Sequence, residues 1–134
     1  MKIEIWSDIM CPFCYIGKRH FDKALKKFPH KDKVQIQWHS FQLQPDIETK
    51  PGKSVKEFLA EVKGISLEKS QQIHENVTKM AFDAGLHYDF DKAIVANTMD
   101  AHRLTHLAEK YRLQHQIEER LFSAYFTEGS NRAR

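Results

Sequence analysis

Two cysteines, Cys11 and Cys14, are the only cysteines of this 134-residue chain, and two residues separate them. A short run of alternating polar and apolar residues, 2–6, precedes the pair, and residues 16–28 follow it with helical periodicity. A Cys-x-x-Cys at a turn between a strand and a helix is typical of thiol–disulfide redox chemistry. The pair is therefore the first candidate for a catalytic site.

The position of each cysteine predicts its chemical role. The thiolate is the reactive form of cysteine, and the unpaired amides and positive dipole end of a helix start favour an anion. We therefore expect the helix start to lower the pKa of Cys11. Cys14 follows one helical turn later, where its sulfur can reach Cys11 and resolve a mixed disulfide. Pro12 suits the first helical position, because its φ is already helical and no amide hydrogen is needed there.

The cysteine pair has two other interpretations, half of a zinc site and two buried structural thiols. A zinc site needs a second pair of ligands, which two of the eight histidines or a second chain would have to supply. His102 and His106 have the i, i+4 spacing of metal ligands, but the residues between them lack the glutamate of a zinc-protease helix. We interpret both histidines as surface residues and predict no metal site.

Residues 7–18, Ser-Asp-Ile-Met-Cys-Pro-Phe-Cys-Tyr-Ile-Gly-Lys, resemble the active-site signature of the FrnE-like branch of the DsbA family of thioredoxin-fold oxidoreductases. Residues 41–45, 97–104 and 121–126 fit the same resemblance in order and spacing. The resemblance extends from residue 1 to about residue 129. It implies that Cys11 and Cys14 are the catalytic residues of a thiol:disulfide oxidoreductase.

In such enzymes the two residues between the cysteines help to set the reduction potential, here Pro12 and Phe13. No histidine stands between the cysteines to stabilise a thiolate, so we expect a weaker oxidant than DsbA itself.

The resemblance also implies an α/β fold, thioredoxin-like and of the DsbA type, with a helical insertion domain. Residues 1–50 correspond to the N-terminal β-α-β half of a thioredoxin-like domain, and residues 51–134 to the helical insertion domain. The family's second half, with two strands, a closing helix and a cis-proline loop, has no counterpart after Gly129. We therefore expect the C-terminal β-β-α half to be missing from this chain.

Hydrophobic periodicity and capping residues predict the elements around the motif. The predicted strands are residues 2–6 and 34–38, and residues 46–53 are predicted to form a loop. The expected helices are residues 16–28, 54–64, 66–85, 97–111 and 114–127, with N-caps at Ser54 and Ser66 and a C-cap at Gly64. Lys18 and Arg19 fall largely outside the apolar stripe of the first helix, where they are either ordinary surface residues or a source of positive potential near the motif.

Composition and motifs narrow the function further. The formal net charge of +3 is too small to indicate nucleic-acid binding. No apolar signal segment follows Met1, and no stretch is long enough to span a membrane, so we expect a cytoplasmic protein. The sequence has no dinucleotide-binding or phosphate-binding motif, so we expect no cofactor. We expect electrons to arrive through glutathione or another thiol. The predicted partners are protein or small-molecule thiols and disulfides, with no nucleic acid and no membrane.

Two alternative functions remain open. One is a glutathione-dependent transferase or isomerase of the kappa or hydroxychromene-carboxylate type, although those families typically have serine where Cys11 stands. The other is an inactive remnant that acts only by association. Two strands with a bare edge are marginal alone, so we also expect a homo-oligomer. Six aromatic residues could line a substrate groove, namely Trp6, Phe13, Tyr15, Trp38, Phe41 and Tyr88. We expect most of them to be in the core and Phe13 to be at least partly exposed.

Overall fold

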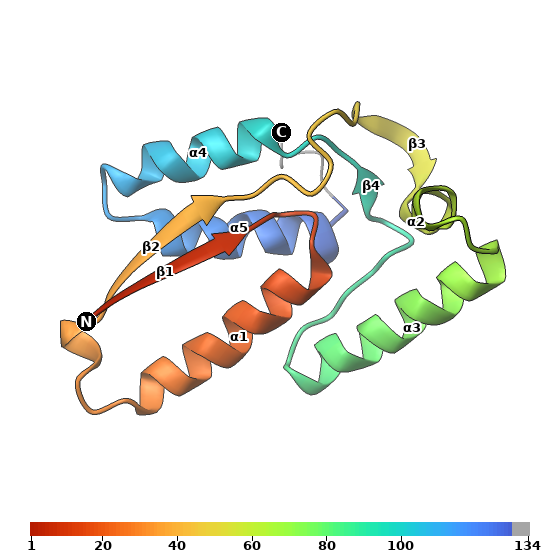
Figure 1. Ribbon diagram of the computed structural model, residues 1–134. Coiled ribbons are helices and arrows are strands. Elements are labelled where there is room, and N and C mark those ends of the chain that lie inside the picture. The colour runs from red at the N-terminus through yellow and green to blue at the C-terminus, as the bar shows by residue number, and fades with distance from the viewer. Residues whose placement is uncertain (130–134) are drawn as a thin grey trace.

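The structure, a computed structural model, describes residues 1–129 and begins with a β-α-β unit that leads into a mostly helical block (Figure 1). In chain order the elements are β1 (Lys2–Ser7), α1 (Pro12–Lys27), a short 3-10 turn (Lys31–Lys33), β2 (Gln35–Ser40), β3 (Lys50–Ser54), α2 (Val55–Lys63), α3 (Leu67–Asp83), β4 (Ile94–Val95), α4 (Met99–Glu109) and α5 (Gln114–Phe126). The predicted helices and the first two strands are therefore present at nearly their predicted positions.

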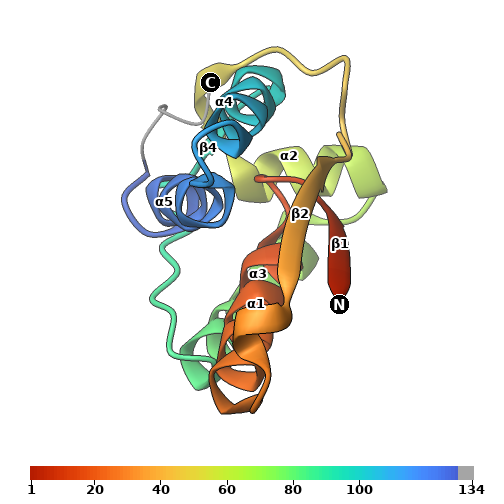
Figure 2. The same ribbon diagram turned by 90° about the vertical axis from the view of Figure 1, so that its left-hand side faces the viewer.

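Strands β1 and β2 pair in parallel, with Ile3 opposite Ile36 and Ile5 opposite Trp38. Helix α1 makes the crossover that a parallel pair requires. Figure 2 shows β1 on the outer side of the pair and α5 on the β2 side. The side-chain amide of Gln114, the first residue of α5, accepts a hydrogen bond from the backbone N–H of Trp38 (2.9 Å) and donates one to its carbonyl (3.0 Å). This side chain thus occupies part of the β2 edge that another strand would otherwise pair with.

The helical block contains a second, two-stranded sheet that the sequence patterns did not predict. β3 pairs antiparallel with β4, with Lys50 opposite Val95 and Ser54 opposite Ile94, and the register shifts between these pairs. β3 lies mostly in the segment predicted as a loop. Its sequence, Lys-Pro-Gly-Lys-Ser, has neither apolar alternation nor β-branched residues, so only its partner some 40 residues away along the chain makes it a strand.

The local capping residues act as predicted. The Ser54 hydroxyl accepts a hydrogen bond from Lys56 N at the start of α2, and the Ser66 hydroxyl accepts one from Lys69 N at the start of α3. Gly64 ends α2 with φ of 65°, a left-handed conformation that favours glycine.

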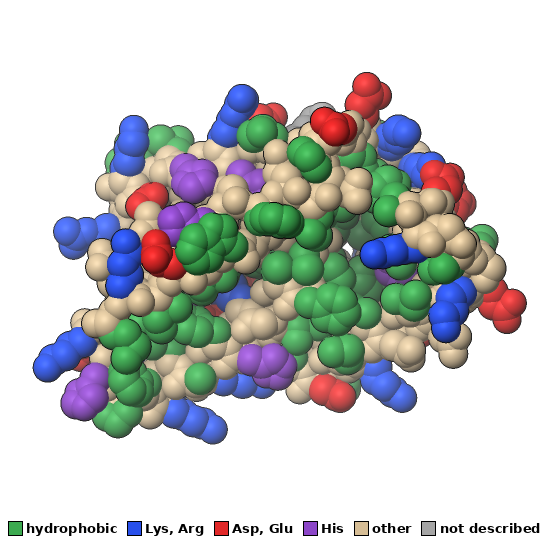
Figure 3. Space-filling view, viewed as in Figure 1, with side chains coloured by type: hydrophobic (Ala, Val, Ile, Leu, Met, Phe, Trp, Pro, Cys, Tyr) green, Lys and Arg blue, Asp and Glu red, His purple; other side chains and the backbone are tan. Residues whose placement is uncertain are grey.

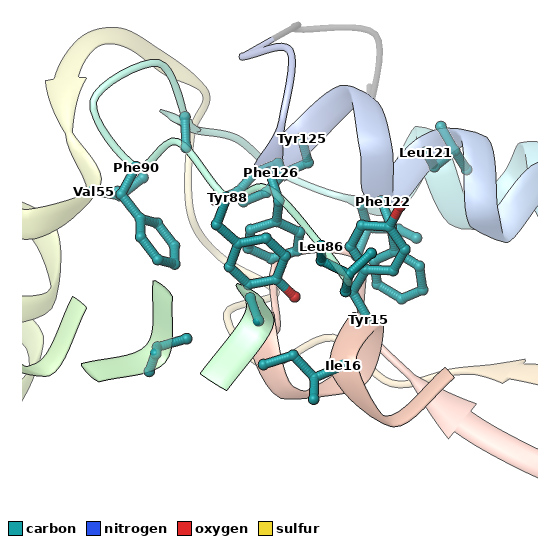
Figure 4. Packing of buried hydrophobic residues seen from close by; sticks show 14 of the residues in the cluster. Tyr15, Ile16, Val55, Leu86, Tyr88, Phe90, Leu121, Phe122, Tyr125 and Phe126 are labelled. Atoms are coloured by element: carbon teal, nitrogen blue, oxygen red, sulfur yellow. The ribbon is translucent and has the colours of Figure 1, made fainter. Parts of the chain in front are cut away.

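An aromatic cluster joins the start of α1 to the end of α5 and to the 86–90 link (Figure 4). The Tyr15 ring stacks on Phe122 with centroids 5.0 Å apart, and Tyr88 stacks on Phe126 at 4.8 Å. Both predicted segments of the chain contribute to this core, and the boundary at residue 50 stays a prediction. The core places the first turn of α1, which carries both cysteines, against the helical block.

Helix α1 buries a cation that its periodicity had placed on the outside. Lys18 is 4% exposed, and its ammonium pairs with Asp22 at 2.9 Å and with Glu119 of α5 at 3.2 Å. The interpretation of Lys18 as a surface residue is therefore wrong. The α5 carboxylate that makes this burial possible lies about a hundred residues away in sequence and cannot be seen in a helical pattern.

Candidate active site at the Cys11–Cys14 turn

The turn between β1 and α1 places the two cysteines as their spacing predicts. The backbone N–H of Cys11 donates to the Asp8 carbonyl at 3.1 Å, which closes the turn after β1. Cys11 is the N-cap residue of α1 in an extended conformation, and Pro12 follows at the first helical position. The Cys14 N–H donates to the Cys11 carbonyl at 3.1 Å, so Cys14 stands one turn into the helix.

The two cysteines are free, partly buried thiols that titrate as a pair. A hydrogen bond from the Cys11 thiol, reinforced by the Asp8 backbone and opposed by burial, lowers the pKa of Cys14 to about 6. The same hydrogen bond and burial raise the pKa of Cys11. The pair therefore loses its first proton more readily than an isolated thiol and holds the second more tightly.

This outcome corrects the expectation that the helix start would give Cys11 the lowered pKa. The amides of Cys14 and Phe13 do lower the pKa of Cys11, as the geometry of a helix start requires. When Cys11 donates the shared proton to Cys14, this hydrogen bond and burial raise the pKa of Cys11 by more than the two amides lower it. One proton between two sulfurs stabilises whichever sulfur accepts it, and the sequence alone does not show which one that is.

Asp8 connects the turn to two other segments through three hydrogen bonds. Its carboxylate is 2% exposed and accepts bonds from Leu43 N (2.8 Å), Thr98 Oγ1 (2.6 Å) and His102 Nε2 (3.0 Å). Burial would raise the pKa of Asp8, but these bonds outweigh it and hold the pKa below its ordinary value. The turn is thus tied to the segment after β2 and to the start of α4.

The Asp8 contacts overturn one interpretation of the histidines. His102 is 4% exposed and bonded to Asp8, so its assignment to the surface is wrong, whereas His106 is exposed as predicted. The two side chains do not converge on one point, because His106 instead bonds to the Ser40 hydroxyl at 2.8 Å. Within residues 1–129, no three histidine, cysteine, aspartate or glutamate side chains gather closely enough to hold a metal ion.

Two further groups contact or face the turn. The Tyr88 hydroxyl donates to the Pro12 carbonyl at 2.6 Å, which fixes the first turn of α1 to the aromatic core. Glu118 of α5 is 3% exposed, and its Oε2 has no hydrogen-bond partner among the described residues. Burial, together with the negative charge of Cys14 and Asp8 and against the opposing charge of Lys18, raises the pKa of Glu118 to about 8. A buried carboxyl group of this kind can hold or accept a proton near neutral pH.

The outer side of the turn faces a cavity of about 760 Å³, to which Cys11, Pro12 and Phe13 contribute but Cys14 does not. Phe13 is 53% exposed, as predicted. Tyr15, Trp38 and Tyr88 are buried in the core, also as predicted. Trp6 and Phe41 are outside the core, at 60% and 56% exposed beside the β1–β2 sheet.

Comparison with known proteins identifies the family. The sequence matches the model of the DSBA-like thioredoxin domain over residues 2–134. The chain belongs to this DsbA-like family. The predicted thioredoxin-like fold of the DsbA type, in which a helical segment follows the β-α-β half, is thereby confirmed.

This DsbA-like chain aligns with only part of the length of two related proteins. YwbO of Bacillus subtilis (strain 168), an uncharacterised protein, is 31% identical over 132 residues, which are 98% of this chain and 59% of that protein. The crystal structure of a probable DsbA oxidoreductase from Streptomyces coelicolor superposes with a TM-score of 0.84 at 35% identity, covering 98% of this chain and 55% of that one. The chain thus spans less than two thirds of either protein's length.

Sequence reasoning missed the roles of four side chains around the DsbA-like site, although three of them left a signal. Thr98 and His102 are one helical turn apart, so both can face the same point, and that point is Asp8. Glu118 has the i, i+3 and i+7 spacing from the buried residues Leu121 and Tyr125, which places a carboxyl group on an apolar face. The Tyr88 hydroxyl left no signal, because its acceptor is a backbone carbonyl 76 residues away.

Proposed function

We propose that this chain carries the redox centre of a FrnE-like thiol:disulfide oxidoreductase. Cys11 forms the mixed disulfide with substrate, and Cys14 resolves it. The observation that carries the proposal is the placement of the two sulfurs. Cys11 caps α1 and lines the cavity, while Cys14 stands one turn deeper and interacts with the Cys11 thiol. Exchange in two steps requires one sulfur that the substrate can reach and a second sulfur that can reach the first. Cys11 and Cys14 are arranged in this way.

In the reducing direction, the proton shared by the pair passes to Cys14, and the Cys11 thiolate attacks one sulfur of a substrate disulfide and releases the other as a thiolate. The Cys14 thiolate then attacks the Cys11 sulfur, forms the Cys11–Cys14 disulfide and releases the second substrate thiolate. Two electrons pass from the protein to the substrate, and the two thiol protons end on the released thiols. Oxidation is the same sequence reversed, and the compartment's thiol poise sets the direction.

The buried groups behind Cys14 suit the second step. Cys14 must be a thiolate when it attacks, and the hydrogen bond from the Cys11 thiol that lowers its pKa in the reduced pair is no longer present in the mixed disulfide. When Cys11 is in a mixed disulfide its thiol proton is gone, so another group must take the proton from Cys14. Glu118, coupled to Cys14 by charge and with a free buried oxygen, is the acceptor we propose.

We also propose a cytoplasmic setting in which glutathione or another thiol is the electron partner, since a dithiol exchanges electrons directly with other thiols. Equilibration of the chain with glutathione buffers of graded ratio, followed by alkylation and mass measurement, would give its reduction potential. A pair that never oxidises across the whole range would contradict this proposal.

The assignment of the two cysteines is tested by trapping. With a simple aromatic disulfide as substrate, Cys14→Ser should accumulate a stable adduct at Cys11, because no second thiol is left to resolve it. Cys11→Ser should react slowly and accumulate little adduct, because Cys14 does not line the cavity. Mass spectrometry of the digested protein locates the adduct. Faster trapping on Cys14 in the Cys11→Ser variant than on Cys11 in Cys14→Ser would reverse the roles.

A further inference from the structure

The cavity beside Cys11 extends well beyond the cysteine pair. It is enclosed by the turn before α1, by α2 and α3, by β4 and by the end of α5. Hydrophobic side chains border an opening between the body of the molecule and the side that carries α2 and α3 (Figure 3). Its lining is mostly apolar and includes Val55, Phe58, Leu59, Val77, Phe90 and Phe126. The redox step itself needs only the two sulfurs, so this volume is available for another part of the substrate.

We propose that this cavity binds the non-reacting part of a small organic disulfide or thiol that has an apolar body and an acidic group. The inference rests on the proposed function and adds a substrate class to it. The substrate sulfur lies at Cys11, its apolar body fills the space between α2, α3 and the aromatic residues, and its acidic group lies near Lys63.

The size and chemistry of the lining favour a small molecule. A volume of about 760 Å³ is within the range of sites for small ligands. A peptide backbone carries an N–H and a C=O at nearly every residue, and an apolar wall leaves those groups without partners. An alkyl or aromatic body has no such groups. The wall therefore discriminates against a peptide inside the cavity and in favour of an apolar substrate.

The charge of the lining favours an acid. Lys63, the last residue of α2, contributes a cation, and no aspartate or glutamate is among the described residues that line the cavity. His74 is the other titratable side chain on the wall apart from Cys11 and Tyr125. Its Nδ1 donates a hydrogen bond to the Ser70 carbonyl at 2.8 Å, and burial lowers its pKa, so it is neutral at pH 7. A carboxylate is therefore attracted to Lys63 without a competing anion on the wall.

The exchange with such a substrate is balanced by the two steps of the proposed function. The bond between the substrate sulfurs breaks as the Cys11–substrate bond forms, and the leaving thiolate takes up one proton. Attack by Cys14 then breaks the Cys11–substrate bond and forms the protein disulfide. The apolar thiol is released with the second proton, and the protein has lost two electrons to the substrate.

Alkyl 2-pyridyl disulfides test the substrate class, because the leaving group stays constant while the alkyl chain grows. The Cys14→Ser variant reacts once at Cys11, and the absorbance of released pyridine-2-thione gives the rate. The relative rate is this rate divided by the rate of 2-mercaptoethanol with the same probe. Each buried methylene should raise the relative rate up to about fourfold, so octyl should exceed methyl by at least about tenfold. At equal length, a terminal carboxylate should react faster than a terminal trimethylammonium.

Matched variants connect the effect to the cavity. Phe58→Gln should remove most of the octyl advantage, which is the ratio of the octyl rate to the methyl rate measured in the same variant. Phe82→Gln is the control, because Phe82 is an exposed phenylalanine on α3 outside the lining. Lys63→Glu should reverse the charge preference, whereas Lys79→Glu, on the exposed side of α3, should not.

Equal relative rates along the alkyl series would overturn the inference. So would a faster reaction of a short cysteine peptide activated with the same pyridyl group than of the octyl probe, since that result favours peptide substrates. The proposed function is read separately in the wild-type chain, where Cys14 must release the alkyl thiol after the pyridine-2-thione. Release with every probe at equal rates would leave the exchange function standing and remove only the cavity proposal.

Discussion

Replacing Glu118 by glutamine should stabilise the folded protein in alkaline solution and change it little in acid. Glu118 is almost fully buried, and its Oε2 has no hydrogen-bond partner among residues 1–129. Burial, with the charges of Cys14 and Asp8, raises its pKa to about 8. The native state therefore keeps a proton on this carboxyl group under conditions in which the unfolded chain has lost it.

The sign and the size follow from that difference in proton binding. Between the ordinary glutamate pKa of 4.5, which holds in the unfolded chain, and the native value of about 8, the native state binds more protons, so its stability falls as the pH rises. The stabilising contribution is complete below pH 4.5 and is lost by about pH 8. At about 1.4 kcal/mol for each unit of pKa difference, the loss is at most about 5 kcal/mol. Glutamine does not ionise, so the stability of the variant does not fall in this way as the pH rises.

Urea unfolding of the reduced protein at pH 5, 7 and 8.5 measures the effect. The quantity that matters is the difference in unfolding free energy between Glu118→Gln and wild type, because the ionisation of Cys14 changes both proteins. That difference should grow by several kcal/mol in favour of the variant from pH 5 to pH 8.5. Glu75→Gln, an exposed glutamate on α3, is the control and should show no such growth. A difference that stays constant with pH would refute the reasoning, since it would mean that Glu118 ionises normally.

Three other predictions concern the turn and the sheet. Asp8→Asn should destabilise the protein by about 2 kcal/mol in urea unfolding at pH 7, because it removes the buried carboxylate that accepts hydrogen bonds from Thr98 and His102; a change below about 0.5 kcal/mol would contradict those contacts. Phe13→His should make the active-site disulfide more oxidising in a glutathione titration, because a cation beside the thiolate stabilises the reduced form; an unchanged potential would mean that the side chain points away from the sulfurs. Sedimentation at micromolar concentration should show a dimer or larger oligomer, because Trp6 and Phe41 expose apolar surface beside the sheet, and a well-folded monomer would contradict this.

The structure of the described residues matches the sequence-based predictions where the interactions that control the structure are local. The Cys-x-x-Cys, the proline after its first cysteine and the helix that follows are adjacent in sequence, so their geometry could be predicted from the order of residues alone. The caps at Ser54 and Ser66 bond to amides two and three residues away and were predicted for the same reason. No helix among residues 1–129 is long and apolar enough to cross a membrane.

Tertiary structure decided the environment of the redox pair. Whether His102 is a surface residue or a partner of Asp8 depends on a contact across 94 residues, and the burial of Lys18 depends on a carboxylate 101 residues away. β3 is a strand only because β4 pairs with it. The sequence by itself determined which two sulfurs stand one helical turn apart at the start of α1. Their protonation depends on buried charges and shared protons, whose energies change with distance and solvation, and these are set only when remote segments pack together.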